Sequence, residues 1–170
     1  MSQYFLTSDF RLKKSELGDK EGAIADYNEA IRLKPDYASA YINRGNAKYE
    51  LGDKQGAISD YNEAIRLNPN YAEAYYNRGS AKHTIGDYRG AIADYTDAIR
   101  INQNLGVYKS GYFGLPSAYY WRGGAKSVLG DKEGAISDYT ESIRLRNHLR
   151  SHRGEISQHF TDQSQVNKRL

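Results

Sequence analysis

One short segment recurs four times along the chain of 170 residues, with only small changes. Its copies, the first of which reads LGDKEGAIADYNEAIRL, occupy residues 17–33, 51–67, 85–101 and 129–145. The steps between successive copies are 34, 34 and 44 residues. A period of 34 residues is typical of arrays of helix–turn–helix units, in which each unit packs only against its neighbours. The chain is therefore expected to form a stack of small units rather than one globule.

Each copy contains signals for the end of one helix and the start of another. Its apolar residues recur with the spacing of a helical stripe, as in residues 23–31. A glycine can end the preceding helix and an aspartate can cap the next one, as at Gly52 and Asp53. Pro35 and Pro69 stop the second helix of two copies. We predict an all-α structure without β-sheet, with a second helix near 20–33 and helix pairs near 37–67, 71–101 and 117–145.

The third copy shows most clearly a resemblance to a known family. In AEAYYNRGSAKHTIGDYRGAIADYTDAIR (72–100), Tyr75 stands at the first aromatic position of the tetratricopeptide repeat family. Gly79 matches the small residue of the family's first helix, and the small–aromatic–small set of the second helix is Ala91, Tyr95 and Ala98. The NRG triplet found here is common in bacterial members. The resemblance covers residues 17–145 and implies a right-handed α-solenoid of stacked antiparallel helix pairs, with about 3.5 repeats.

Two positions of the first helix depart from the pattern of the family. Arginine replaces a leucine before the glycine, and lysine replaces a later tyrosine, as at Arg78 and Lys82. Each second helix also carries an aspartate, so we predict a ladder of Arg–Asp pairs that keeps partly buried charges paired. Arg78 could pair with Asp94 of its own repeat or with Asp60 of the preceding one, and the sequence leaves both open. The ladder residues are Arg44, Arg78 and Arg122, with Asp26, Asp60, Asp94 and Asp138.

Three segments interrupt the repeat array of residues 17–145. Residues 1–16 are expected to form a degenerate first helix or cap, because an arginine stands where the close-packing glycine belongs. An insertion at 102–116 accounts for the longer third step, and it either folds back on the repeats, extends the binding surface or is a mobile linker. Residues 146–170 form a basic tail that either extends the last helix as far as Gly154 or is mobile.

A stack of this kind leaves a long concave surface lined by the first helix of each repeat. The same position in successive repeats then lies along one groove. Asparagine amides can bond an extended backbone, and aromatic side chains offer apolar contacts at low entropy cost. We predict that a peptide or a partner helix binds in this groove. The groove residues expected from the family's geometry are Ile42, Asn43, Asn46, Tyr49, Glu73, Tyr76, Asn77, Ser80, His83, Tyr120 and Trp121.

Some of these residues have alternative roles. Asn43 and Asn77 either contact a ligand or bond to solvent and helix neighbours. Trp121, the only tryptophan, either anchors a ligand or packs beneath the insertion. One subclass of the family binds the C-terminal carboxylate of chaperones through a clamp of Lys, Asn and Arg. That clamp is not expected here, because Glu73 would repel a carboxylate and the lysine positions hold Phe5, Ser39, Glu73 and Ser117.

Composition and motifs narrow the function further. The chain has no cysteine, a net charge of +3 and no long apolar stretch, so neither disulfides nor a membrane span are expected, and the cytoplasm is the predicted location. His148 and His152 lack an evident third ligand, so no metal is expected. We predict a non-catalytic, cofactor-free module that binds a protein or peptide; its partner's identity and its oligomeric state stay open. The alternative is a nucleic-acid-associated repeat protein that uses its basic tail, although the predicted groove has almost no Lys or Arg.

Overall fold

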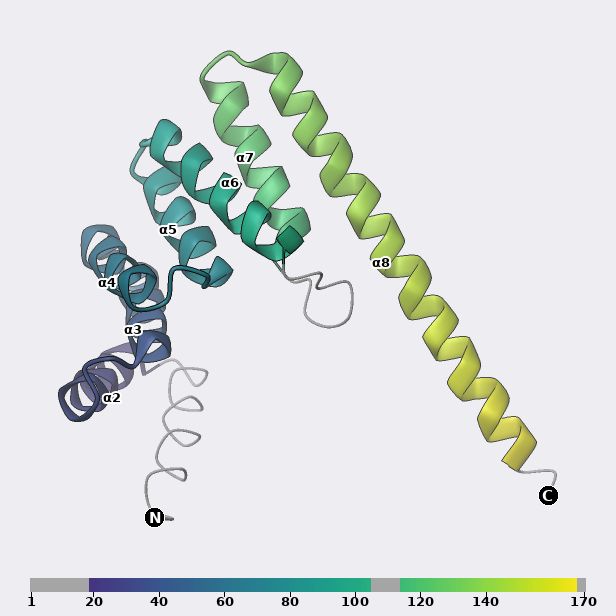
Figure 1. Cartoon of the computed structure of the whole chain (residues 1–170), viewed down its shortest axis with the longest axis horizontal. Coiled ribbons are helices and arrows are strands. Elements are labelled where there is room, and N and C mark those ends of the chain that lie inside the picture. The colour runs from purple at the N-terminus through teal and green to yellow at the C-terminus, as the bar shows by residue number, and fades with distance from the viewer. Residues whose placement is uncertain (1–18, 105–113, 168–170) are drawn as a thin grey trace.

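The computed structural model describes residues 19–104 and 114–167. These residues form seven helices and no strand, so the all-α prediction is confirmed. Successive helices pack side by side as antiparallel hairpins, and the hairpins stack into the arch of Figure 1, which is an α-solenoid. In chain order the helices are α2 (Lys20–Leu33), α3 (Ala38–Glu50), α4 (Lys54–Leu67), α5 (Ala72–Thr84), α6 (Tyr88–Asn104), α7 (Leu115–Val128) and α8 (Lys132–Asn167).

A tight turn joins the two helices of each repeat. Gly52 adopts a φ of 93°, a left-handed conformation that residues with a side chain rarely take. The next residue, Asp53, caps α4, because its carboxylate accepts a hydrogen bond of 2.9 Å from the backbone N–H of Gly56. Gly86 and Gly130 also have positive φ and precede capping aspartates. The predicted glycine stop and aspartate cap are therefore both found at these turns.

The predicted interruptions of the array are only partly within the described residues. Residues 1–16 lie outside them, as do residues 105–113 of the insertion. The two ends of the insertion are helical and belong to α6 and α7. The last helix continues past Gly154 to Asn167 and leaves the stack as a single straight arm (Figure 1). Of the two alternatives for the tail, the structure has the helix, and this helix is longer than expected.

Tyrosines packed among small residues form the core between the helices. Tyr61 of α4 and Tyr95 of α6 are fully buried in separate clusters along the stack. Gly45 allows α4 to approach α3, because a Cβ atom added there would lie 2.7 Å from Cε1 of Tyr61. At Gly79 the corresponding distance to Cε1 of Tyr95 is 3.0 Å. The small residues of the first helices thus allow the close helix spacing that the sequence predicted.

The hairpins α3–α4, α5–α6 and α7–α8 each contain an Arg–Asp pair with a buried carboxylate. In the α5–α6 hairpin, Arg78 donates through Nε and Nη2 to the two carboxylate oxygens of Asp94. Lys82 lies 2.9 Å from the same carboxylate. The predicted ladder is confirmed at Asp60, Asp94 and Asp138, and Arg78 pairs within its own repeat rather than with Asp60. The pairs, with their Nη2–Oδ1 distances, are Arg44–Asp60 (2.5 Å), Arg78–Asp94 (2.6 Å) and Arg122–Asp138 (2.6 Å).

The same arginines also connect neighbouring repeats. Nη1 of Arg78 donates a hydrogen bond of 2.7 Å to Oδ1 of Asn62 in the preceding second helix. Each guanidinium therefore fastens its own hairpin and the one before it at the same time, a connection that the sequence did not predict. The equivalent bonds run from Arg44 to Asn28 (2.7 Å) and from Arg122 to the hydroxyl of Thr96 (3.1 Å).

Two glycines of the first helices provide a matched test of helix spacing. Gly45→Ala should lower the free energy of unfolding by about 1–3 kcal/mol, because the buried ring of Tyr61 must move. At Gly124 the nearest atom to an added Cβ is Oη of Tyr139, at 3.7 Å. Gly124→Ala should therefore be neutral or raise the stability by up to about 1 kcal/mol, through helix propensity. Urea unfolding followed by circular dichroism measures both, and equal effects would contradict this account of the core.

The ladder can be tested at Asp138. Burial raises the pKa of Asp138, but hydrogen bonds from Arg122 and Lys126 outweigh burial, and the pKa is lowered. The resulting stabilisation is complete above the unfolded-state pKa and is lost as the pH falls through the folded-state value. Asp138→Asn should lower the free energy of unfolding at neutral pH by about 3 kcal/mol, because Arg122 and Lys126 lose their counter-charge. It should also weaken the loss of stability below about pH 4.

The control for this test is Asp97→Asn, which removes an acid of the same type from an exposed pair. Asp97 lies 3.0 Å from Arg100 at the surface of α6, and such exposed pairs contribute less than about 1 kcal/mol. Urea unfolding of the wild type and both variants, from neutral pH into acid, gives the comparison. If Asp138→Asn were no less stable than Asp97→Asn, the buried pair would not have the stabilising role proposed for it.

Candidate functional site

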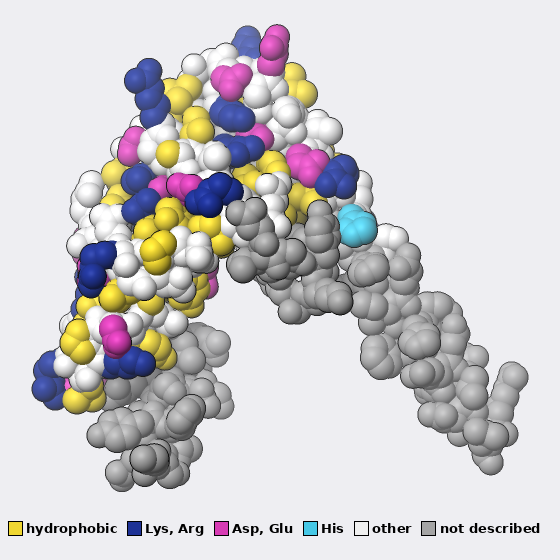
Figure 2. Space-filling view, in the orientation of Figure 1, with side chains coloured by type: hydrophobic (Ala, Val, Ile, Leu, Met, Phe, Trp, Pro, Cys, Tyr) yellow, Lys and Arg dark blue, Asp and Glu magenta, His cyan; other side chains and the backbone are white. Residues whose placement is uncertain are grey.

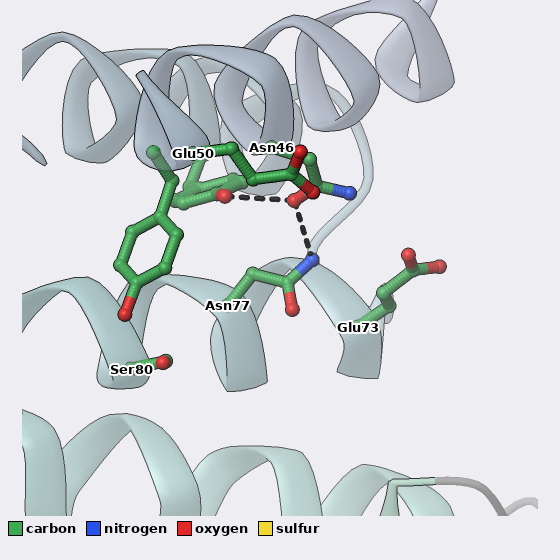
Figure 3. Close-up of a pocket in the computed structure, with 7 residues that line it drawn as sticks. Asn46, Glu50, Glu73, Asn77 and Ser80 are labelled. Atoms are coloured by element: carbon green, nitrogen blue, oxygen red, sulfur yellow. Dashed lines mark hydrogen bonds between the residues drawn. The ribbon is translucent and has the colours of Figure 1, made fainter. Parts of the chain in front are cut away.

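The first helices α3, α5 and α7 contact one another in order along the stack, and we call their shared surface the first-helix face. Between α3 and α5 this face contains a pocket of about 270 Å³. Figure 3 shows side chains of the two helices pointing toward each other across the pocket. The residues that line it are Asn46, Tyr49, Glu50, Tyr61, Glu73, Asn77 and Ser80.

The amide of Asn46 organises one wall of the pocket. Its Oδ1 atom accepts a hydrogen bond of 2.7 Å from the hydroxyl of Tyr61 and one of 3.0 Å from Nδ2 of Asn77 (Figure 3). A further hydrogen bond of 2.9 Å joins the hydroxyls of Tyr49 and Thr84. Two of these bonds link α3 to α5 and the third links α3 to α4, so the pocket is already held in shape before a ligand binds.

The pocket also has two carboxylates. Glu50 forms an ion pair with Lys20 of α2. Glu73 forms neither a hydrogen bond nor an ion pair with any described residue, and partial desolvation raises its pKa. No lysine, arginine or histidine belongs to the pocket lining. The pocket therefore presents negative charge beside amide and hydroxyl groups that can donate or accept hydrogen bonds.

Aromatic side chains gather farther along the first-helix face, between α5 and α7. The ring centroids of His83 and Trp121 are 5.5 Å apart, and those of Tyr120 and Trp121 are 5.4 Å apart, both edge to face. Arg146 of α8 lies 5.5 Å from the ring centroid of Tyr120. Trp121 is 42% exposed and Tyr120 is 44% exposed. We call His83, Tyr120 and Trp121 the aromatic cluster.

Most of the predicted groove residues lie on the first-helix face. Tyr76 is half-buried and packs on Tyr95, with ring centroids 5.8 Å apart. Asn43 is half-buried on α3 but is not among the residues that line the pocket. Ile42 is 1% exposed in the hydrophobic core, so its side chain supports the face from within instead of lining it. Three predicted residues form the aromatic cluster, and those in the pocket are Asn46, Tyr49, Glu73, Asn77 and Ser80.

The sequence analysis did not name two of the pocket residues. Glu50 follows Asn46 by four positions on α3, a spacing that places both on the same side of a helix and could have identified it. Tyr61 belongs to the apolar stripe of a second helix, and that stripe was assigned to the core. Its ring is indeed buried, but its hydroxyl reaches the pocket through Asn46.

The tyrosine that follows one repeat later lacks this partner. Tyr95 occupies the position of Tyr61 in the next hairpin, where Ser80 replaces Asn46. The shorter serine side chain replaces the amide, and the buried hydroxyl of Tyr95 has no hydrogen-bond partner among the described residues. The two tyrosines therefore share a packing position and differ in hydrogen bonding.

Models of a single repeat family match the chain. A model described as TPR repeat matches residues 15–52 and 45–86, and two models described as tetratricopeptide repeat match residues 72–105 and 116–148. The chain belongs to the tetratricopeptide repeat family. The matched residues coincide with the stacked hairpins, so the resemblance seen in the sequence is confirmed over nearly the whole array.

Solved structures share the tetratricopeptide repeat fold of this chain. Two crystal structures of MamA are 24% and 28% identical, with TM-scores of 0.74 and 0.72; they cover 85% and 84% of this chain and 79% and 73% of their own. The first TPR of Spaghetti (RPAP3), bound to the HSP90 peptide SRMEEVD, is 23% identical, with a TM-score of 0.65, and covers 74% of this chain and 92% of its own. No curated protein matches the sequence.

Membership of the tetratricopeptide repeat family has consequences for function. Domains of this family typically bind protein or peptide partners and are generally non-catalytic. The chain is therefore a protein-interaction module. Among the described residues, no helix is both long and apolar enough to cross a lipid bilayer. The same residues contain no group of three or more His, Cys, Asp or Glu side chains that could hold a metal ion.

The two core tyrosines of this tetratricopeptide repeat array offer a matched test of the pocket wall. Tyr61→Phe should lower the free energy of unfolding by about 1 kcal/mol, because Asn46 loses a buried donor. Tyr95→Phe should be neutral or slightly stabilising, because it removes a hydroxyl without a partner. Thermal and urea unfolding of both variants check the difference. The opposite order of stabilities would show that the hydroxyl of Tyr61 is not the bonded one in solution.

Proposed function

We propose that this tetratricopeptide repeat array is a non-catalytic module that binds a peptide segment or a helix of a partner along the first-helix face. The observation that carries the proposal is the exposure of Trp121 and Tyr120 beside each other on that face. Large aromatic side chains in such positions are the commonest anchors of protein interfaces. Contacts with His83 and with Arg146 hold their rings in place, which reduces the entropy lost when a partner binds.

The pocket between α3 and α5, next to the aromatic cluster along the first-helix face, supports the same proposal. Its amide and carboxylate groups can bond the polar backbone or side chains of a segment whose apolar residue contacts the aromatic cluster. Because Asn46 and Asn77 are bonded to each other, a ligand meets an arrangement that needs little rearrangement. In a typical peptide-binding surface, polar groups provide specificity in one part and apolar side chains provide contact area in another.

The peptide-bound structural neighbour supports a peptide as the class of ligand, but not the same peptide. The first TPR of Spaghetti is bound to SRMEEVD, which is an acidic sequence. Here Glu73, one of the positions where the carboxylate clamp has a lysine, is a solvent-exposed acid in the pocket lining. Repulsion between this carboxylate and an acidic ligand therefore argues for a partner of different charge.

Nucleic acid is a weaker proposal for the described part of the chain. Phosphate contacts need clusters of Lys and Arg. In the view of Figure 2, basic and acidic side chains are interspersed over the described residues and form no continuous basic surface. Several of the arginines are also bonded to carboxylates of the ladder, as Arg78 is to Asp94. The observations thus favour a protein or peptide partner.

The proposal can be tested with a displayed library of random twelve-residue peptides selected on the full chain. Peptides that bind the first-helix face should bind Trp121→Ala more weakly by about 2 kcal/mol, or roughly thirtyfold in Kd, the loss expected when a central aromatic anchor is truncated. Fluorescence anisotropy of the labelled peptides measures the affinities.

The matched control is Tyr37→Ala, which removes an aromatic side chain of similar exposure, 39%, from the turn before α3. Selected peptides should bind this variant with unchanged affinity. Peptides that bind Trp121→Ala as tightly as the wild type would place the binding surface elsewhere. A selection that enriches no peptide would argue against a peptide-binding role of the chain.

A further inference from the structure

We propose that the pocket between α3 and α5 binds the cationic side chain, lysine or arginine, of a peptide that lies along the first-helix face. This inference rests on the proposed function and adds the chemistry of the ligand. The pocket is a partly open hollow between two helices, with Asn46 and Glu50 on one side and Glu73 and Asn77 on the other (Figure 3). A volume of about 270 Å³ gives room for the end of one long side chain.

Several oxygen atoms of the pocket can accept hydrogen bonds from a ligand. Nδ2 of Asn77 donates one of its two N–H groups to Asn46, and the side-chain oxygen of Asn77 can accept a bond from a ligand. The hydroxyl of Tyr61 is likewise used as a donor to Asn46. The carboxylate oxygens of Glu73 have no partner among the described residues. An ammonium group carries three N–H donors and a guanidinium carries five, and neither has an acceptor, so both match this set of free atoms.

The charges around the pocket favour the same ligand. Lys20 pairs with Glu50. Lys54 donates to the backbone oxygen of Tyr49 and lies 3.5 Å from the centroid of its ring, so this ammonium group is also engaged. Glu73 has no basic partner among the described residues, and desolvation of this carboxylate raises its pKa. A cation brought by the ligand would supply the missing partner for Glu73.

Two other ligand classes fit less well. A carboxylate or phosphate would meet two acids and no basic side chain of the lining, which is unfavourable. A divalent metal ion usually takes several charged oxygen ligands in its coordination shell. Only Glu50 and Glu73 are acids in the lining, and the described residues contain no group of three metal-ligating side chains. An organic cation on a peptide needs only hydrogen bonds and one or two carboxylates.

The test uses three blocked heptapeptides, Ac-GSAXASG-NH2, in which X is arginine, its neutral isostere citrulline, or glutamate. Each is titrated into the full ¹⁵N-labelled chain, and amide shifts are recorded by NMR. The arginine peptide should shift the amides of residues 46–50 and 73–80. The citrulline peptide should bind about fivefold more weakly, as expected for the loss of one partly exposed charge pair, and the glutamate peptide should not bind there. Added salt should weaken the arginine peptide most.

Two variants test whether Glu73 causes the preference for arginine over citrulline. Glu73→Gln keeps the shape of the pocket and should remove the preference for arginine over citrulline. Glu63→Gln removes the same charge from an exposed pair with Arg66 on α4 and should leave the preference unchanged. Citrulline binding as tightly as arginine, or an arginine preference that survives in Glu73→Gln, would overturn the inference, as would the absence of any shift in the pocket.

The remaining outcomes separate this inference from the proposed function. Tighter binding of the glutamate peptide at the same amides would overturn the cation preference but keep a peptide-binding face. Calcium or magnesium chloride, titrated alone, should not shift these amides, and a shift would identify a metal site instead. The library could also yield peptides whose binding depends on Trp121 but that contain no basic residue. That result would support the proposed function and contradict the inference of a cationic ligand.

Discussion

One guanidinium group holds together each of the hairpins α3–α4, α5–α6 and α7–α8. Arg78 bonds both carboxylate oxygens of Asp94 in its own hairpin, donates to Asn62 of the preceding hairpin, and lies 5.4 Å from the ring centroid of Tyr75. The planar fork of arginine can satisfy these partners together, whereas an aliphatic side chain would leave Lys82 as the one remaining described basic partner of the buried carboxylate of Asp94. The stack therefore depends on a polar contact that joins two hairpins, in addition to the burial of tyrosine and alanine.

The helices and the ladder were predictable because they follow from spacing and from the rule that buried charges are paired. The direction of the ladder was not, because Arg78 is 16 positions from Asp94 and 18 from Asp60, and sequence separation does not distinguish the two. The bond from Arg78 to Asn62 was unpredictable for a related reason. It depends on the angle at which one hairpin packs on the next, and that angle results from the packing of many side chains together.

The candidate site was predictable as a face and less so as individual contacts. Register placed Ile42, Tyr76 and Tyr120 at one position of successive first helices, yet Ile42 is 1% exposed and Tyr120 is 44% exposed. Register gives the direction of a side chain, but burial depends on what the neighbouring hairpin places over it. Asn77 was expected to contact a ligand or a neighbour, and its amide bonds to Asn46, so one donor of the predicted site already has a partner.

The repeats share the Arg–Asp pairs that hold the stack together and differ at several positions of the first-helix face. Asn46, Ser80 and Gly124 occupy the same place in three successive first helices, and the side chain becomes smaller at each step. The hydroxyl of Tyr61 consequently has an amide partner, and that of Tyr95 has none among the described residues. An amide therefore occupies this position only on α3, where the pocket is polar and acidic. Serine replaces it on α5 and glycine on α7, where aromatic rings gather. The Arg–Asp ladder thus holds a face whose chemistry changes along the stack, and a peptide bound in the proposed way would meet different chemistry at its two ends.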